Sequence, residues 1–442
     1  MRSLPELAAL RYSRGLVRIP PEIDVPLTPR VQRLIDTSQF RRLAGISQLG
    51  LVSLVYPAAN HTRFEHSLGV YRMALLFLDR FADDERFAAV VNPADAERFL
   101  VAALLHDVGH WPFCHPIEDV SLPEVPKHEQ FAAKFLRQTE IANALREDWN
   151  LEADDVVSLL SGEPLTVADR LLQSLLSGPI DVDKMDYLMR DSLHAGVPYG
   201  RNFDQARLIQ SLCLNEAGDG LAITDKGKTA AEMMVFARYV MFSEVYWHHA
   251  VRSATAMLQR AFVMIGAQID YDATFVMTER PMIEHLLSVS GEGPVRGLLD
   301  GLFGPTRRLY KRVAQFSLYH EPELYDLLAR RPYSWLTRCA ENFAAAASKS
   351  LGQPVQPHEV LFDAPPVKLE VQFQIDVRFP KENCYRRLGE ISPVVETLAK
   401  QQFDDYVKRV RVFADPRLAS ELDRHGNLTG LVREAVSATG CN

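Results

Sequence analysis

The chain has 442 residues, of which 47% are hydrophobic and 24% charged, and its formal charge at pH 7 is −8. This composition is that of an ordinary folded protein and excludes disordered and fibrous classes, while the acidic balance argues against a general nucleic-acid coat protein and leaves specific nucleic-acid binding open. No apolar run reaches the roughly 18 residues of a membrane helix, and the five scattered cysteines lack a CxxC pair, so we expect a cytoplasmic protein with reduced thiols and no membrane attachment.

Helical patterning dominates the first three hundred residues. Asn92 and Pro93 predict a helix N-cap followed by proline at the first helical position. Gly178 and Pro179 break the chain before another helical pattern. The helices predicted from apolar spacing are Arg63–Phe81, Ala94–Leu105, Asp181–Leu193 and Glu232–Ile265.

The pattern changes near residue 350. Apolar and polar residues alternate strictly over Leu369–Phe379, which predicts a strand with one buried face. Ser392 and Pro393 predict the start of a helix that continues to about Tyr406, and Val410–Phe413 predicts a second short strand.

These elements predict a mainly α protein with a smaller C-terminal α+β region. We place the helical domain at residues 1–300 and the α+β region at 301–442. The segment Gly352–Pro366 is rich in proline and is expected to join the helical part of the chain to the strand-forming part that follows it.

Histidines and aspartates gather in the helical part, where five of the thirteen histidines lie between residues 61 and 115. His106 and Asp107 end an apolar helix, and burying both groups is costly unless something binds them. With His66 and Asp183 they form a mixed set of imidazoles and carboxylates that suits a divalent transition metal with open positions. For His106 and Asp107 taken alone, a helix-terminal polar pair is the simpler interpretation.

Three segments in fixed order resemble the HD superfamily of metal-dependent phosphohydrolases. They are QLGLVSLVYPAANHTRFEHSLG, LLHDVGHWPFCH and IDVDKMDYLMRDSLHAG. Within the superfamily they are most similar to the deoxynucleoside triphosphate triphosphohydrolases, the branch of the bacterial dGTPases. The resemblance covers about residues 16–270 and implies an HD core at about 45–195.

The resemblance implies a role for each matching residue. The implied metal ligands are His66, His106, Asp107 and Asp183. The implied catalytic residues at the leaving oxygen are His128, His110 and Glu118, the last of which stands where the family has an aspartate. The implied substrate-binding residues are Gln48, Arg63, His115, Lys184, Tyr187, Asp191, Arg238 and Tyr246. Two positions depart from the family pattern: Phe242 replaces a histidine and His249 replaces a lysine. For Arg63 a structural alternative is an ion pair with Glu65 or Asp79 on a solvated face.

The implied activity is hydrolysis of deoxynucleoside triphosphates to deoxynucleoside and inorganic triphosphate, with Mn, Fe, Mg, Zn, Ni or Co as the divalent ion. Tyr246 packed on the sugar would leave little room for a 2′-hydroxyl. Two alternatives stay open: an HD phosphohydrolase acting on another phosphoester, such as a nuclease, and a non-catalytic nucleotide sensor. The family also implies a homo-oligomer (dimer, tetramer or hexamer) and an allosteric nucleotide.

The segment before the first motif bears on that allosteric nucleotide. Members activated by a guanine nucleotide carry Asp, Gln and Arg there, whereas this chain has Asp36, Arg41 and Ala44. Alanine replaces neither the charge nor the stacking plane of arginine. We therefore expect that GTP is not an obligate activator.

Overall fold

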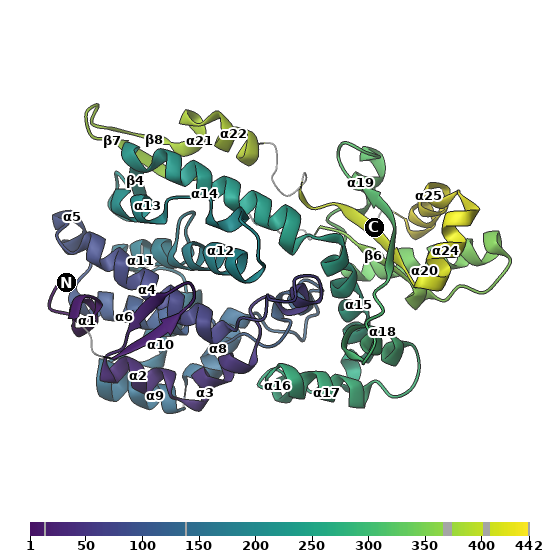
Figure 1. Ribbon diagram of the computed structural model, residues 1–442, viewed down its shortest axis with the longest axis horizontal. Coiled ribbons are helices and arrows are strands. Elements are labelled where there is room, and N and C mark those ends of the chain that lie inside the picture. The colour runs from purple at the N-terminus through teal and green to yellow at the C-terminus, as the bar shows by residue number, and fades with distance from the viewer. Residues whose placement is uncertain (13–14, 138, 366–373, 401–406, 441–442) are drawn as a thin grey trace. The chain divides into compact units, whose positions relative to one another are not determined.

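The computed structural model describes residues 1–442 except 13–14, 138, 366–373, 401–406 and 441–442 (Figure 1). The chain forms two compact units, each assembled from separate stretches of sequence. The first unit comprises residues 1–112, 126–241 and 372–400, and the second comprises 113–125, 242–371 and 401–442.

The first unit is mainly helical, with short strands. Its helices are α1 (Pro5–Tyr12), α2 (Pro29–Ile35), α3 (Ser38–Arg41), α4 (Arg63–Phe81), α5 (Glu85–Ala88), α6 (Pro93–Leu105), α8 (His128–Leu136), α9 (Glu140–Ala144), α10 (Ala153–Ser161), α11 (Val167–Ser177), α12 (Val182–His194), α13 (Gln205–Ser211), α14 (Lys228–Met241), α21 (Leu388–Ile391) and α22 (Pro393–Lys400). Its strands are β1 (Leu16–Ile19), β2 (Ile23–Pro26), β3 (Leu212–Leu214), β4 (Leu221–Thr224), β7 (Asp376–Phe379) and β8 (Cys384–Arg387).

Helix α4 lies at the centre of this unit and packs against both α6 and α12 (Figure 1). Most of its side chains are buried because apolar residues occur on nearly every face. The predicted start of α6 is confirmed: the Asn92 side chain accepts a hydrogen bond from the Asp95 N–H, and the Asn92 backbone N–H donates to the Asp95 carboxylate. The packing of α4, α6 and α12 brings the ends of three helices to one place.

Two sheets flank the helices of the first unit. β1 and β2 form an antiparallel hairpin, and the other sheet has the order β3-β4-β7-β8. β7 is parallel to β4, with Val377 opposite Ile223. The strand predicted at Leu369–Phe379 is present from Asp376 onward, and its residues 369–373 lie outside the described part of the chain. The predicted helix after Ser392 is α22, and its expected last turns at 401–406 also fall outside.

The second unit combines helices with a three-stranded antiparallel sheet of order β5-β9-β6. Its helices are α7 (Cys114–Glu118), α15 (His249–Ile265), α16 (Tyr271–Thr274), α17 (Glu279–Val289), α18 (Pro294–Phe303), α19 (Pro322–Leu328), α20 (Tyr333–Leu351), α24 (Pro416–His425) and α25 (Leu428–Thr439). Its strands are β5 (Lys311–Phe316), β6 (Val360–Asp363) and β9 (Val410–Ala414), the last of which confirms the strand predicted at Val410–Phe413.

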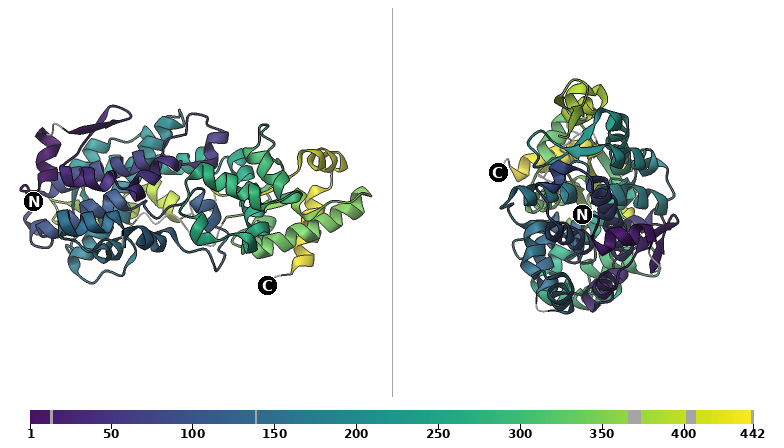
Figure 2. Two further views of the ribbon diagram at one scale, coloured as in Figure 1. Left: turned by 90° about the horizontal axis from the view of Figure 1, so that it is seen from below. Right: turned by 90° about the vertical axis from the view of Figure 1, so that its left-hand side faces the viewer.

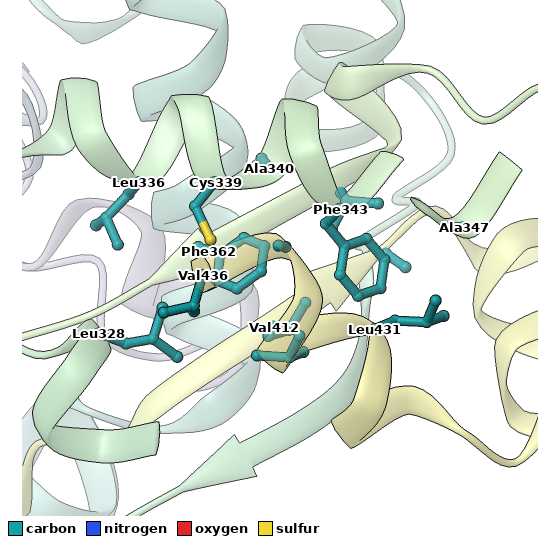
Figure 3. Close-up of a cluster of buried hydrophobic side chains, with 14 of the residues drawn as sticks. Leu328, Leu336, Cys339, Ala340, Phe343, Ala347, Phe362, Val412, Leu431 and Val436 are labelled. Atoms are coloured by element: carbon teal, nitrogen blue, oxygen red, sulfur yellow. The ribbon is translucent and has the colours of Figure 1, made fainter. Parts of the chain in front are cut away.

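Helices α20 and α25 pack together beside this sheet (green and yellow in Figures 1 and 2). Phe343 from α20, Leu431 from α25 and Phe362 from β6 meet in the apolar cluster of Figure 3. Val412 of β9 faces the same cluster, as expected for alternate residues of a strand with one face on the core.

Two predictions about the connections are wrong. The helix expected over Glu232–Ile265 is two helices: α14 ends at Met241, a π-helical turn covers Phe242–Tyr246, and His248 then caps α15 by accepting the Ala250 N–H. The segment Gly352–Pro366 is not a simple linker, because it contains β6, whose four residues are all buried. The domain division at 1–300 and 301–442 stays a prediction, although residues 372–400 belong to the first compact unit.

The mainly α fold with small sheets is confirmed. Among the described helices, none combines the length and the apolar character that a membrane crossing requires.

Candidate metal centre

The predicted ligand residues of the first unit converge on one place. His66 Nε2 lies 3.0 Å from Asp183 Oδ1 and 3.2 Å from His106 Nε2. Asp107 Oδ1 lies 3.4 Å from His106 Nε2. The donor atoms of His66, His106 and Asp107 all fall within 4.8 Å of one another, a grouping that could hold a metal ion.

Helix ends position these side chains. Thr62 caps α4 by accepting the Glu65 N–H, which places His66 in the first turns of that helix. His106 is the C-cap of α6, and Asp183 lies in the first turn of α12, whose N-cap is Asp181. Because each group stands at a helix end, its donor atoms reach the common point from a rigid element.

The cluster is buried on one side and open on the other. The side chain of His66 is 1% exposed, whereas that of Asp183 is 35% exposed. A ligand would therefore approach from the Asp183 side.

The charges of the cluster stabilise one another. Burial opposes protonation of His66, but its hydrogen bonds with Asp183 and Asp186 prevail and raise its pKa to about 10. Burial likewise opposes ionisation of Asp107, and the neighbouring Arg63 with nearby histidines holds the pKa of that carboxyl well below its usual range. The anionic carboxylates and imidazole nitrogens are the mixed donor set that divalent transition metals accept.

Each histidine of the cluster is oriented through its second ring nitrogen. His106 Nδ1 lies 2.9 Å from the carbonyl oxygen of Ala103, and His66 Nδ1 lies 2.9 Å from Asp186 Oδ2. In both rings Nε2 is thereby directed at the common point, as in metal-ligating histidines. Sequence analysis missed Asp186, although its spacing of three from Asp183 on a predicted helix was a usable signal.

His110 and His128 form a second imidazole group close to the cluster. Their ring centroids are 3.9 Å apart with planes tilted by 41°. His110 Nδ1 lies 3.0 Å from Asp107 Oδ1, so the pair is joined to a predicted ligand. Gly109 permits this approach, since a Cβ there would lie 2.2 Å from the His128 carbonyl oxygen at the start of α8.

Cationic side chains adjoin the cluster. Arg63 is buried and its Nη1 donates to Asp107 Oδ2 at 2.8 Å, so the alternative pairing with Glu65 or Asp79 on a solvated face is wrong. Lys184 Nζ donates to Asp181 Oδ2 at 2.5 Å.

Tyr187 and Arg238 share this charged environment. Burial raises the pKa of the Tyr187 phenol to about 12 against the opposing influence of Arg238 and Lys184. Arg238 is itself buried on α14. Tyr187 is thus an electrostatic neighbour of Asp183, Lys184 and Arg238.

Gln48 and Asp191 both contact His61, which lies just before α4. The Gln48 N–H donates to the His61 carbonyl oxygen, and His61 Nε2 lies 3.0 Å from Asp191 Oδ1. Gln48 Oε1 is buried without a hydrogen-bond partner among the described residues. It is therefore an acceptor available to a ligand hydroxyl.

The remaining predicted site residues belong to the second unit. His115 and Glu118 lie in α7, with Nδ1 and Oε2 3.6 Å apart. Tyr246 lies in the π-helical turn, where its ring meets that of Phe242 edge to face at 5.1 Å. Their predicted roles at the substrate stay predictions.

Comparison with known families agrees with this geometry. The HD domain matches residues 63–174, and the HD associated region matches residues 203–427, which is half of the chain. The chain therefore belongs to the HD-domain proteins that carry an HD-associated region.

Similar proteins include a deoxynucleoside triphosphate triphosphohydrolase. Human SAMHD1, which bears that name, is 30% identical over 276 residues, covering 56% of this chain and 44% of SAMHD1. "Uncharacterized protein YwfO" of Bacillus subtilis is 35% identical over 257 residues, covering 58% of this chain and 56% of YwfO. The chain spans about half the length of the curated relatives it matches.

Solved structures share the fold over most of the chain. A hypothetical protein of Aquifex aeolicus superposes with a TM-score of 0.71 at 27% identity, covering 93% of this chain and 99% of the other. A phosphohydrolase of Bacteroides thetaiotaomicron superposes with a TM-score of 0.66 at 23% identity, covering 91% and 99%. The latter likeness concerns the fold alone.

Proposed function

We propose that the protein is a metal-dependent phosphohydrolase that converts deoxynucleoside triphosphates to deoxynucleosides and inorganic triphosphate. The observation that carries the proposal is the convergence of His66, His106, Asp107 and Asp183 beside two cationic side chains, Arg63 and Lys184. The similarity to the SAMHD1 proteins, which are named deoxynucleoside triphosphate triphosphohydrolases, supports the choice of deoxynucleotides.

The four clustered residues would hold the divalent ion. Two imidazoles and two carboxylates suit Mn, Fe, Mg, Zn, Ni or Co and leave positions open for further ligands. When bound, such an ion polarises a phosphoryl oxygen and lowers the pKa of water.

Arg63 and Lys184 would receive the phosphates. Each now pairs with a carboxylate, Asp107 and Asp181, so its position is fixed before any substrate arrives. Donors held in place inside a protein stabilise developing negative charge without reorganisation. Arg238 would add a third cation.

His128 or His110 would donate a proton to the 5′-oxygen as it leaves. The contact of His110 with Asp107 and the close approach of the two rings would hold both imidazoles at the phosphate side. A positioned imidazole is the commonest general acid in enzymes. The resemblance assigns a catalytic role to Glu118 as well.

The sugar would lie along α12. Tyr187 and Asp191 are one turn apart on that helix, and the free Oε1 of Gln48 offers an acceptor for a hydroxyl. The resemblance assigns His115 and Tyr246 to the sugar as well, and the Tyr246 ring would then exclude a 2′-hydroxyl. We further propose that the protein acts as a homo-oligomer.

The experiment that tests the proposal separates products by chromatography after incubation with each dNTP and NTP plus Mn²⁺ or Mg²⁺. We expect a deoxynucleoside and triphosphate, and no turnover by Asp183→Ala. The matched control is Asp169→Asn, a carboxylate that pairs with Arg98 in the same unit and should leave turnover intact. Release of orthophosphate or nucleoside monophosphates would favour another HD phosphohydrolase activity, and nucleotide binding without turnover would favour a sensor.

A further inference from the structure

We propose that Asp186 is a positioning residue that fixes the tautomer and ring orientation of His66, and that Arg190 clamps Asp186 in place. This inference rests on the proposed metal site, because it states that Asp186 strengthens metal binding there. Both residues lie in the third motif segment, where the resemblance assigns neither of them a role.

The His66 ring lies between two carboxylates, one at each ring nitrogen. Its Nδ1 lies 2.9 Å from Asp186 Oδ2, and its Nε2 lies 3.0 Å from Asp183 Oδ1. A carboxylate can only accept, so Asp186 holds a proton on Nδ1, and Nε2, which faces Asp183, is the ring nitrogen left for a metal. His66 and Asp186 are both buried, and water cannot substitute for this contact.

Arg190 holds Asp186 by both carboxylate oxygens. Its Nε donates to Oδ2 at 2.8 Å and its Nη2 donates to Oδ1 at 2.8 Å. Asp186 and Arg190 are four residues apart on α12, so the helix itself sets the geometry of this fork. The carboxylate therefore has one orientation available, and that orientation faces His66.

A second helix anchors the arginine. Arg190 Nη1 donates to Glu65 Oε1 at 2.6 Å, and that same oxygen lies 2.9 Å from His194 Nε2. Glu65 precedes His66 on α4. Arg190 thus ties α12 to the part of α4 that carries the ligand.

Gly69 on α4 leaves room for Asp186 and Arg190 because it has no side chain. A Cβ at Gly69 would lie 2.0 Å from Asp186 Oδ1 and 2.4 Å from Arg190 Nη2. Only a residue without a side chain lets α4 and α12 approach this closely. A side chain at position 69 would therefore displace Asp186 and Arg190 from these positions.

The test is titration of Mn²⁺ into the full-length, metal-free protein by calorimetry. Asp186→Asn keeps the shape but loses the charge and one acceptor oxygen, so its NH2 group must face either His66 Nδ1 or Arg190 Nη2, which are both donors. Loss of such a partner typically weakens metal binding about 10–100-fold, and we expect a loss of that size. Asp169→Asn is the control: it removes a carboxylate paired with Arg98 and should lower stability but leave the Mn²⁺ affinity unchanged.

A second variant guards against misfolding. Arg190→Lys keeps one positive charge but cannot engage both oxygens of Asp186, so we expect a smaller loss of Mn²⁺ affinity with native circular dichroism. If wild type binds Mn²⁺ and the variants bind it equally well, the role of Asp186 is overturned while the metal site stands. If wild type binds no Mn²⁺, the proposed function fails as well.

Discussion

Arg63 Nη1 lies 2.8 Å from Asp107 Oδ2, and both residues are buried. A side chain assigned to phosphate thus touches a side chain assigned to the metal. Each compensates the charge of the other, because an unpaired charge in this place would be strongly destabilising. Phosphate binding and metal binding would accordingly both depend on the ion pair of Arg63 and Asp107.

The first prediction concerns the cationic side chains assigned to phosphate. Arg63→Ala and Lys184→Ala should each lower kcat/KM more than Tyr187→Phe does. Stabilisation of charge in a preorganised site is typically worth about 3 kcal/mol or more, whereas a phenol hydroxyl contributes a hydrogen bond of about 1 kcal/mol. Steady-state kinetics with a dNTP measures the order, and circular dichroism shows whether each variant is folded. The reverse order would place the phosphates elsewhere.

The second prediction separates the two imidazoles. His128 has its ring against that of His110, and His110 Nδ1 is the nitrogen near Asp107. If His128 is the proton donor, His128→Gln should reduce kcat by about 10²–10⁴-fold and leave KM nearly unchanged. His110→Gln should act indirectly and reduce kcat less. Equal rates for wild type and His128→Gln would exclude His128 as the acid.

Local signals in the sequence predicted the elements that hold the site. The N-cap at Asn92 and the helix over Arg63–Phe81 follow from side-chain chemistry within a few residues, and both are present as predicted. The four candidate ligands came from an unusual order of motifs, and the structure brings them together.

Other features depend on contacts that a single segment does not encode. Asp186 and Arg190 have the spacing of an ordinary surface ion pair, and only the approach of α4 at Gly69 makes them a buried clamp. The pairing of β4 with β7 joins segments more than a hundred residues apart, so neither strand pattern reveals it. The π-helical turn at Phe242–Tyr246 likewise interrupts a helical pattern that continues without a break in the sequence.

The third prediction concerns the second unit. Phe343 is fully buried, and its ring meets that of Phe362 edge to face at 6.0 Å. Phe343→Ala should destabilise the protein by about 3–5 kcal/mol through lost burial and the cavity left behind. The control is Phe236→Ala, an exposed aromatic on α14 whose loss should cost less than about 0.5 kcal/mol. Scanning calorimetry of both variants gives the comparison, and equal transitions would contradict this account of the core.

The last prediction concerns activation by a guanine nucleotide. Asp36 is retained from the family pattern and is exposed at the C-cap of α2. Arg41 holds its guanidinium over the Phe64 ring at 4.8 Å, and Ala44 is exposed and offers no hydrogen-bonding side chain. A guanine base or phosphate would therefore lack the planar, forked donor that an arginine at position 44 supplies.

We accordingly expect both assembly and turnover to proceed without GTP. Light scattering after size exclusion measures the oligomeric state, and product release from a dNTP measures turnover, each with and without added GTP. The matched variant Arg41→Gln/Ala44→Arg rebuilds the residues of the GTP-activated members and should respond to GTP where the wild type does not. An absolute requirement of the wild-type protein for GTP, in both assembly and hydrolysis, would refute this interpretation of Arg41 and Ala44.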